Sequence, residues 1–162
     1  MAQLEKRLYV SVGIPGSGKS YYFLMMDKMG HVVKRVSRDD VRFSITKPDE
    51  KYFAHEKQVY QEYIRQLQEA IDNPEIEWVC ADATHLTKKS RQQLFSHLNL
   101  RGVNAIYIVW VDTPLEKALE RNSRRAGIRN VPEKAIRAMY ESFEVPTCDE
   151  HPLIQAVIRV SE

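Results

Sequence analysis

Short hydrophobic runs alternate along this chain with longer segments whose hydrophobic residues recur every three or four positions. The runs lie at 8–12, 32–36, 76–80, 105–111 and 153–160, and each has the length of a buried β-strand. Helical spacing is found at 18–29, 51–71 and 88–100, and after Pro114 and Pro132, with Thr113 expected to cap the helix at Pro114. Strands separated by helices predict an α/β fold: a mainly parallel five-stranded sheet with helices on both faces and the last strand at an edge.

Composition and charge place few limits on function. The 162 residues are 43% hydrophobic and 28% charged, which suits one domain over 1–162, and the formal charge of +2 gives no global attraction to nucleic acid. The longest apolar runs are too short to cross a membrane, and residues 1–7 lack the apolar segment of a signal peptide. Cys80 and Cys148 have no metal-binding spacing. We therefore expect a cytoplasmic protein with no membrane partner, and the oligomeric state stays open.

The segment 13–20, GIPGSGKS, matches the phosphate-binding P-loop motif and lies between the first strand and the first helix. Its glycines let successive backbone N–H groups point at phosphate oxygens, and the helix start adds further donors. Lys19 is placed to reach the β- and γ-phosphates, and the Ser20 hydroxyl to ligate Mg²⁺. We therefore expect ATP and Mg²⁺ as cofactors, and assign nucleotide binding to Gly13, Pro15, Gly16, Ser17, Gly18, Lys19 and Ser20.

Charged residues follow the second strand at 37–42, in the order SRDDVR. Ligands of a parallel sheet bind at the carboxyl ends of its strands, so this segment should lie beside the P-loop. A carboxylate such as Asp39 could accept the proton of an attacking hydroxyl, and Arg42 could hold a phosphate of the acceptor. The residues alone leave another interpretation open, in which Asp39 or Asp40 caps a short helix and Arg42 is a surface charge.

Positive charge is concentrated near the end of the fourth helical segment. Residues 117–137 hold seven Lys or Arg against two Glu, a local charge of +5. Arg121 and Arg125 are four positions apart, and this spacing disfavours a helix slightly unless an anion lies between them. We expect a lid at about 121–131 whose arginines close over a triphosphate, with Gly127 as a flexible point. The alternative is a solvated basic helix end.

The third strand is followed by Asp82-Ala83-Thr84-His85. Asp82 lies where many P-loop proteins have the carboxylate that binds the water ligands of Mg²⁺, so we assign it to the metal together with Ser20. An aspartate that only ties the strand end to a loop is the alternative. His85 is a candidate acceptor contact or an incidental loop residue.

Four blocks resemble the kinase domain of phage-type polynucleotide 5′-hydroxyl kinases and their small P-loop relatives. They are the P-loop at 13–20, SRDDVR at 37–42, DATHLT at 82–87 and RNSRR at 121–125, and the likeness runs over roughly 7–144. The resemblance implies that Asp39 is the general base, that Arg42 contacts the phosphate beside the accepting 5′-hydroxyl, and that Arg121 and Arg125 are lid residues. With it we assign Lys19, Asp39 and Arg125 to catalysis, and Arg38, Arg42 and Thr84 to the acceptor.

Three functions remain in competition. The leading one is ATP-dependent phosphorylation of the 5′-hydroxyl end of a polynucleotide. The second is a kinase of the same design whose acceptor is a small molecule, a nucleoside or an aminoacyl-tRNA; loss of Arg42 should then spare an acceptor without phosphate. The third is an ATP-binding switch or binding module with little catalysis, in which loss of Asp39 should leave function intact.

Overall fold

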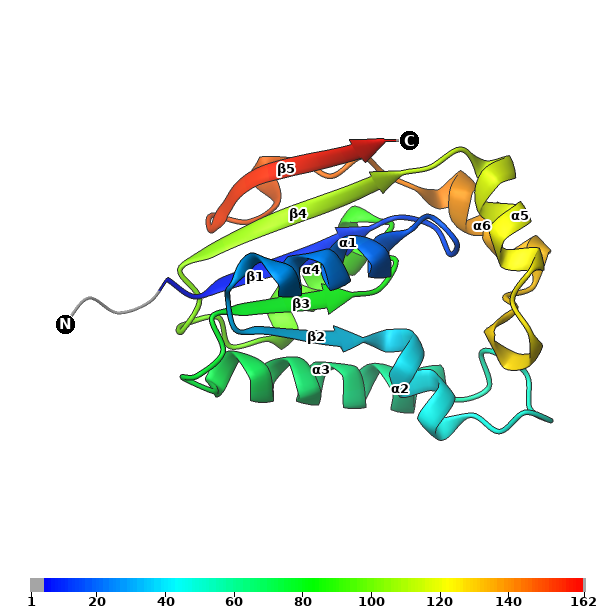
Figure 1. The fold of residues 1–162 in the computed structure, drawn as a ribbon, viewed down its shortest axis with the longest axis horizontal. Coiled ribbons are helices and arrows are strands. Elements are labelled where there is room, and N and C mark those ends of the chain that lie inside the picture. The colour runs from blue at the N-terminus through cyan, green and yellow to red at the C-terminus, as the bar shows by residue number, and fades with distance from the viewer. Residues whose placement is uncertain (1–4, 162) are drawn as a thin grey trace.

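The computed structural model describes residues 5–161, which form one five-stranded sheet with helices around it (Figure 1). Its strands are β1 (Arg7–Val12), β2 (Val33–Ser37), β3 (Trp78–Asp82), β4 (Ala105–Asp112) and β5 (Ile154–Ser161). They lie in the order β2-β3-β1-β4-β5, and every neighbouring pair is parallel. The predicted α/β class is confirmed, and β5 lies at an edge as expected. The sheet is wholly rather than mainly parallel.

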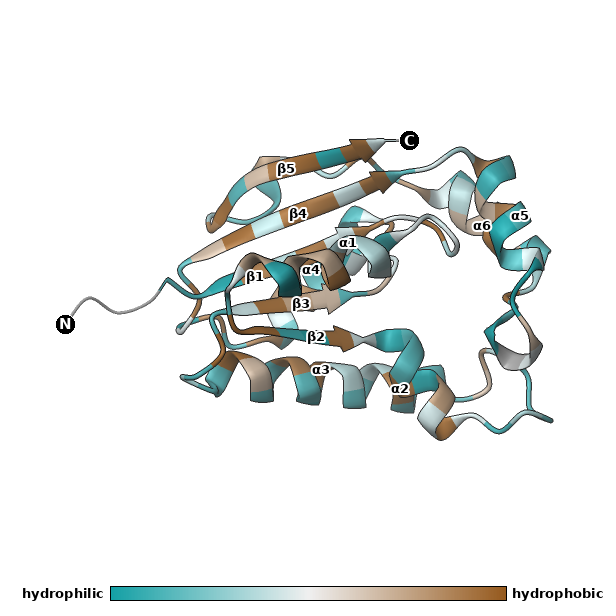
Figure 2. Cartoon of the chain, viewed as in Figure 1, coloured by the Kyte–Doolittle hydropathy of each residue, from teal (hydrophilic) through white to brown (hydrophobic). Residues whose placement is uncertain are grey.

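Helices cover both faces of the sheet. On one face lies α1 (Lys19–Met26), which continues as a 3₁₀ turn (Asp27–Met29) and ends at Gly30. On the other lie α3 (Glu56–Asp72) and α4 (Lys88–His97). Alternation along β1 sends Leu8 and Val10 into the core beneath α3 and α4, and Tyr9 into the core beneath α1. The strands carry most of the hydrophobic colour in Figure 2.

The remaining α-helices lie at the carboxyl end of the sheet (Figure 1). They are α2 (Arg38–Ile45), α5 (Leu115–Ser123) and α6 (Glu133–Ser142), with a 3₁₀ turn (Gly127–Arg129) between α5 and α6 and another (Cys148–Glu150) before β5. A third hydrophobic cluster joins Ile14 of the phosphate-binding loop to Leu119 of α5 and Ile136 of α6. This packing ties the base of the segment 121–131, called the lid segment below, to that loop.

A buried ion pair fixes the loop that follows β3. Arg91 of α4 is fully buried and pairs with Glu150 at 2.6 Å. The same guanidinium group donates to the carbonyl oxygens of His85 (2.7 Å) and Glu144 (3.0 Å). Breaking the pair would leave an uncompensated buried charge, which is strongly unfavourable. The loop after β3 is therefore held against α4 by contacts that are costly to lose.

Two local expectations were wrong. The helix predicted over 51–71 begins at Glu56, because 51–54 form a turn in which the Ala54 N–H donates to the Lys51 carbonyl oxygen. Thr113 does not cap α5, whose N-cap is Pro114. The Thr113 hydroxyl is buried and donates to the Ser17 carbonyl oxygen at 2.7 Å instead.

The expectation about a signal peptide falls partly on residues 1–4, outside the described residues. No helix within 5–161 is long and apolar enough to span a membrane.

Candidate active site

The loop between β1 and α1 has the backbone that its sequence requires. Gly16 and Gly18 have φ values of +82° and +101°, which residues with a Cβ rarely adopt. A Cβ on Gly16 would lie 2.5 Å from the Ala118 carbonyl oxygen of α5, and one on Gly13 would lie 2.7 Å from Ser17 Oγ. These glycines therefore permit both the tight turn and the close approach of α5.

Lys19 lies inside the curl of the loop. Its Nζ donates to the Ile14 carbonyl oxygen at 2.9 Å, and the side chain is almost fully buried. Burial lowers the pKa of Lys19 to about 8, although Asp82 and then Asp39 raise it. The nearby carboxylates therefore do not fully offset the cost of burying this positive charge. An ammonium group in such a position is suited to binding phosphate oxygens.

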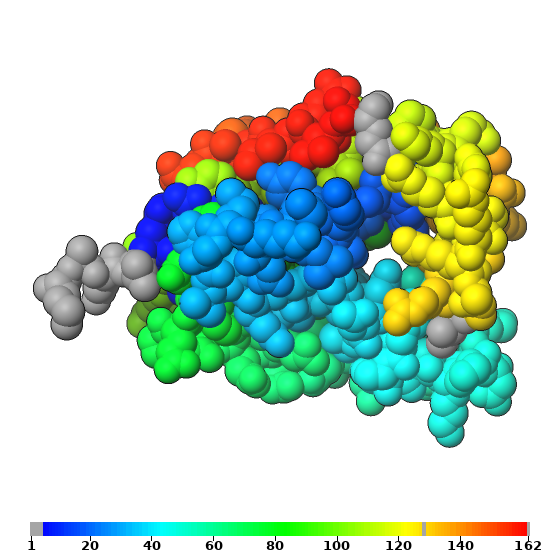
Figure 3. All heavy atoms as spheres, viewed as in Figure 1, coloured from blue at the N-terminus to red at the C-terminus, as the bar shows by residue number. Residues whose placement is uncertain are grey.

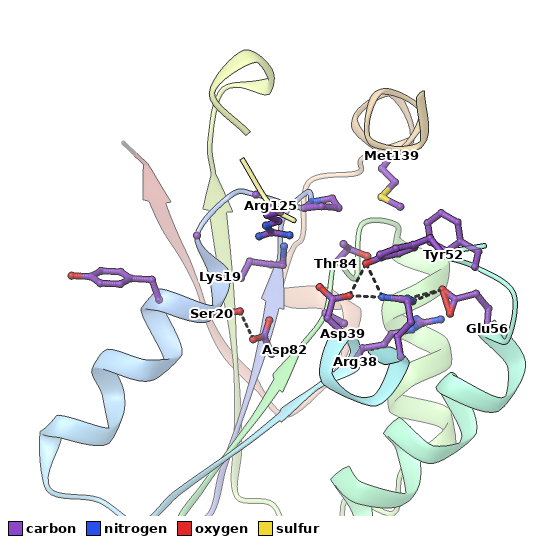
Figure 4. A pocket seen from close by; sticks show the side chains of 17 residues that line it. Lys19, Ser20, Arg38, Asp39, Tyr52, Glu56, Asp82, Thr84, Arg125 and Met139 are labelled. Atoms are coloured by element: carbon purple, nitrogen blue, oxygen red, sulfur yellow. Dashed lines mark hydrogen bonds and ion pairs between the residues drawn. The ribbon is translucent and has the colours of Figure 1, made fainter. Parts of the chain in front are cut away.

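Ser20 and Asp82 meet at the first turn of α1. Ser20 Oγ donates to Asp82 Oδ2 at 2.8 Å, and Asp82 is buried at the end of β3 (Figure 4). A hydroxyl and a carboxylate are hard oxygen donors of the kind that Mg²⁺ prefers. Within 5–161 no three acidic, His or Cys side chains converge on one point.

Arg35 of β2 also reaches this pair, which sequence reasoning did not predict. Its Nε donates to Asp82 Oδ2 at 2.8 Å and its Nη2 to Ser20 Oγ at 3.1 Å. Asp40 lies 3.6 Å from its Nη1. The positive charge of Arg35 therefore stands beside the carboxylate that we assign to the metal.

Asp39, at the start of α2, is held by two side chains. The Arg42 guanidinium pairs with its Oδ1, and the Tyr52 hydroxyl donates to the same oxygen at 3.0 Å. Arg42 is itself buried and pairs with Glu56 of α3 at 2.5 Å. Ser37 caps α2 by accepting from the Asp40 N–H, so neither aspartate is the cap. Asp39 is thus fixed in orientation while its side chain remains 45% exposed.

A cavity of about 430 Å³ brings these groups together (Figures 3 and 4). Asp39 and Lys19 face each other across it, with Arg125 from the lid segment beside Lys19. The predicted site residues that line it are Pro15, Gly16, Gly18, Lys19, Ser20, Arg38, Asp39, Arg42, Asp82, Thr84 and Arg125. A carboxylate, a buried lysine and a lid arginine around one space can position a phosphoryl group against an incoming hydroxyl.

A second cavity of about 660 Å³ lies on the other side of the loop, against α1. Its walls are mostly apolar and include Tyr21, Tyr22, Met25 and Met29. Ser17, Arg121 and Arg125 line it as well. Arg121 Nη1 donates to the carbonyl oxygens of Gly16 (3.3 Å) and Ser17 (3.4 Å), so this arginine braces the phosphate-binding loop. Gly13 lines neither cavity.

Sequence reasoning did not predict four features of the site: Arg35, Glu56, the contact of Tyr52 with Asp39, and the apolar cavity beside α1. Tyr52 and Glu56 lie 13 and 17 positions after Asp39, and no spacing rule links them to it. His85 is no loose loop residue. It is buried, its Nδ1 lies 2.8 Å from the Ser11 carbonyl oxygen, and burial lowers its pKa to about 3.

Comparison with known proteins agrees with this architecture. The profile of a family described as AAA domain matches residues 8–146. A chain of the Pnkp1/Rnl/Hen1 complex is 23% identical with a TM-score of 0.59, over 75% of this chain and 40% of that one. A fungal RNA kinase is 12% identical with a TM-score of 0.65, over 99% and 76% of the two chains. A gluconokinase from Sinorhizobium meliloti is 15% identical with a TM-score of 0.57, over 99% and 84%.

Identities this low are evidence of a shared fold and leave the acceptor open. This chain spans less than half of the first of these structures. No curated protein matches the sequence.

Proposed function

The chain belongs to the AAA domain family, and we propose that it is a P-loop kinase that transfers the γ-phosphate of ATP to the 5′-hydroxyl end of a polynucleotide. One observation carries the proposal: Asp39 opens into the cavity that Lys19 and Arg125 line. A carboxylate held opposite a phosphate-binding lysine is placed to accept the proton of an attacking alcohol.

The two cavities beside the loop support ATP as the donor. The triphosphate would lie along the loop, with Lys19 on its β- and γ-phosphates. Its purine base would enter the apolar cavity beside Tyr21 and Met25. Ser20 and Asp82 would hold Mg²⁺, which neutralises charge on the phosphates when bound. Arg125 lines both cavities and can therefore contact the triphosphate along its length.

The positions of Arg42 and Tyr52 support Asp39 as the general base. Each contacts Asp39 Oδ1, which leaves the other carboxylate oxygen for the acceptor hydroxyl. Arg42 is occupied by Asp39 and Glu56, so its loss would disturb the base for every kind of acceptor. Arg42→Ala consequently separates phosphate-bearing acceptors from others less cleanly than the sequence suggested.

The test replaces Asp39 by asparagine, which keeps the shape and removes the proton acceptor. We expect kcat to fall by about 10²–10⁴-fold, the usual contribution of a general base, while ATP affinity stays nearly unchanged. Transfer of label from ATP to 5′-hydroxyl DNA or RNA gives kcat, and calorimetry gives the affinity. The matched control is Asp40→Asn, since Asp40 is the adjacent, more exposed aspartate and lies outside the cavity lining.

The same assay separates the acceptors when nucleosides and gluconate are offered beside the oligonucleotides. Label transfer to gluconate and none to a polynucleotide would show that the acceptor is a sugar acid. The proposal of a kinase would then stand, and that of a polynucleotide acceptor would be wrong. Full activity of Asp39→Asn would remove the proposed general base.

A further inference from the structure

A third cavity, of about 350 Å³, adjoins the one that holds Asp39. Arg38 and Thr84 line both cavities, so the two spaces meet at these side chains. Its other walls come from Tyr60 of α3, the loop after β3, and Ser90 and Gln93 of α4. The volume falls at the lower end of the range for small-ligand sites, which suits a group of nucleotide size.

The charge of this third cavity differs from that of the first. Asp39, Glu56 and Asp82 line the first cavity, whereas the described residues that line the third include no aspartate or glutamate. Among these residues the Arg38 guanidinium is the charged group, and hydroxyl groups, the Gln93 amide and the neutral His85 ring are the other polar side chains. Such a lining suits an anion bound by Arg38 together with a polar group such as a nucleotide base.

Arg38 carries unused hydrogen-bonding capacity at the junction. Its guanidinium group lies over the Tyr60 ring, 5.3 Å from the centroid, which fixes its position. Its buried Nε has no hydrogen-bond partner within residues 5–161. A buried donor left unpaired is unfavourable, so a ligand oxygen at this point would satisfy it. Arg42, in contrast, already contacts Asp39, Glu56 and Tyr52.

We infer that the third cavity is a subsite for the second nucleotide of the acceptor strand, with Arg38 on the phosphodiester that joins it to the first. This rests on the proposed function: the first nucleotide presents its 5′-hydroxyl to Asp39. The strand then passes between Arg38 and Thr84, and the second base lies beside Gln93 and Ser90. The enzyme therefore distinguishes a dinucleotide from a single nucleotide.

Acceptors of increasing length test the subsite on the intact protein. We expect KM to fall about tenfold from a nucleoside 3′-phosphate to a dinucleotide, the value of one good set of polar contacts, and to change little from dinucleotide to trinucleotide. Equal KM values for the nucleoside 3′-phosphate and the dinucleotide would refute the subsite and leave the kinase intact. Label transfer to none of these acceptors would refute the proposed function, and the subsite with it.

Gln93→Glu provides a second, independent test. The change removes the amide donor beside the second base, a contact that only the dinucleotide can make, so KM should rise more for the dinucleotide than for the nucleoside 3′-phosphate. Gln92→Glu is the matched control, because it adds the same charge one position away on α4, at an exposed residue outside the cavity. Unchanged melting temperatures would show that both variants fold. An equal rise in KM for both acceptors, or equal effects of the two variants, would argue against the subsite.

Discussion

Lys19 carries a buried ammonium group, and a triphosphate bound to the loop would surround it with negative charge. In the described structure burial lowers its pKa to about 8 from an ordinary value of 10.5. Phosphate oxygens around the same group would favour its charged form and raise that pKa again. The bound state therefore holds a proton on Lys19 in a pH range where the free protein has lost it.

This difference predicts how ATP affinity depends on pH. Below about pH 8 Lys19 is charged in both states, and it adds no pH dependence. Above that value binding must take up a proton, so the Kd for ATP should rise with pH by up to about tenfold per unit. Calorimetry between pH 7 and 9.5 measures this, with Lys19→Met as the variant whose weaker binding should stay flat. An affinity that improves with pH in the wild type would contradict the assignment.

Arg35 and a divalent cation would compete for the same carboxylate. The guanidinium group contacts both Asp82 and Ser20, the two groups that we assign to Mg²⁺. Arg35→Gln removes that competing charge, so less Mg²⁺ should be needed for half of the thermal stabilisation by ADP. The shift should be several-fold, and the same variant should melt lower in EDTA because Asp82 loses its charged partner and keeps Ser20. Arg159→Gln is the control, because Arg159 pairs with Asp112 of β4 and not with Asp82. It should leave the Mg²⁺ requirement unchanged. A higher Mg²⁺ requirement in Arg35→Gln would show that Arg35 supports the cation instead.

At the scale of elements, most of the fold could be predicted because it depends on local patterns. The strand runs and helical spacings lie within single segments, and the P-loop motif fixes the turn between β1 and α1. The start of α3 could not be predicted in this way. Hydrophobic spacing suggested Lys51, but the side chains of Tyr52 and Glu56 turn toward Arg42 of α2. That contact depends on how two helices pack, which periodicity does not describe.

The lid segment shows the same division between local and long-range information. Its arginines were visible as a local excess of charge. The two hydrogen bonds that join the ends of the segment were not visible in the sequence. Asn122 donates to the Val131 carbonyl oxygen at 2.7 Å and accepts from the Val131 N–H at 2.9 Å. Arg35 was missed for a related reason. Whether a strand residue points at the site depends on the register of β2 against β3, and single-sequence patterns do not fix that register.

At the scale of the whole molecule, charge is nearly balanced and the basic residues are local. The formal charge is +2, while 117–137 alone carry +5. Among the described residues, the arginines that line the cavity with Asp39 and the third cavity are Arg38, Arg42 and Arg125. Arg42 is already paired with carboxylates. A nucleic-acid strand should therefore be held by very few phosphate contacts.

This distribution predicts a weak dependence of acceptor binding on salt. Each phosphate neutralised on a single strand contributes about −0.7 to the slope of log K against log salt, so one or two contacts give a slope between about −0.7 and −1.4. Fluorescence anisotropy of a labelled 5′-hydroxyl oligonucleotide between about 50 and about 300 mM salt would measure this slope. Arg38→Gln should flatten the slope by about 0.7, since it removes one contact. A slope steeper than about −3 would mean that the strand runs across a broad basic surface, and the two-cavity path from Asp39 past Arg38 would then be wrong.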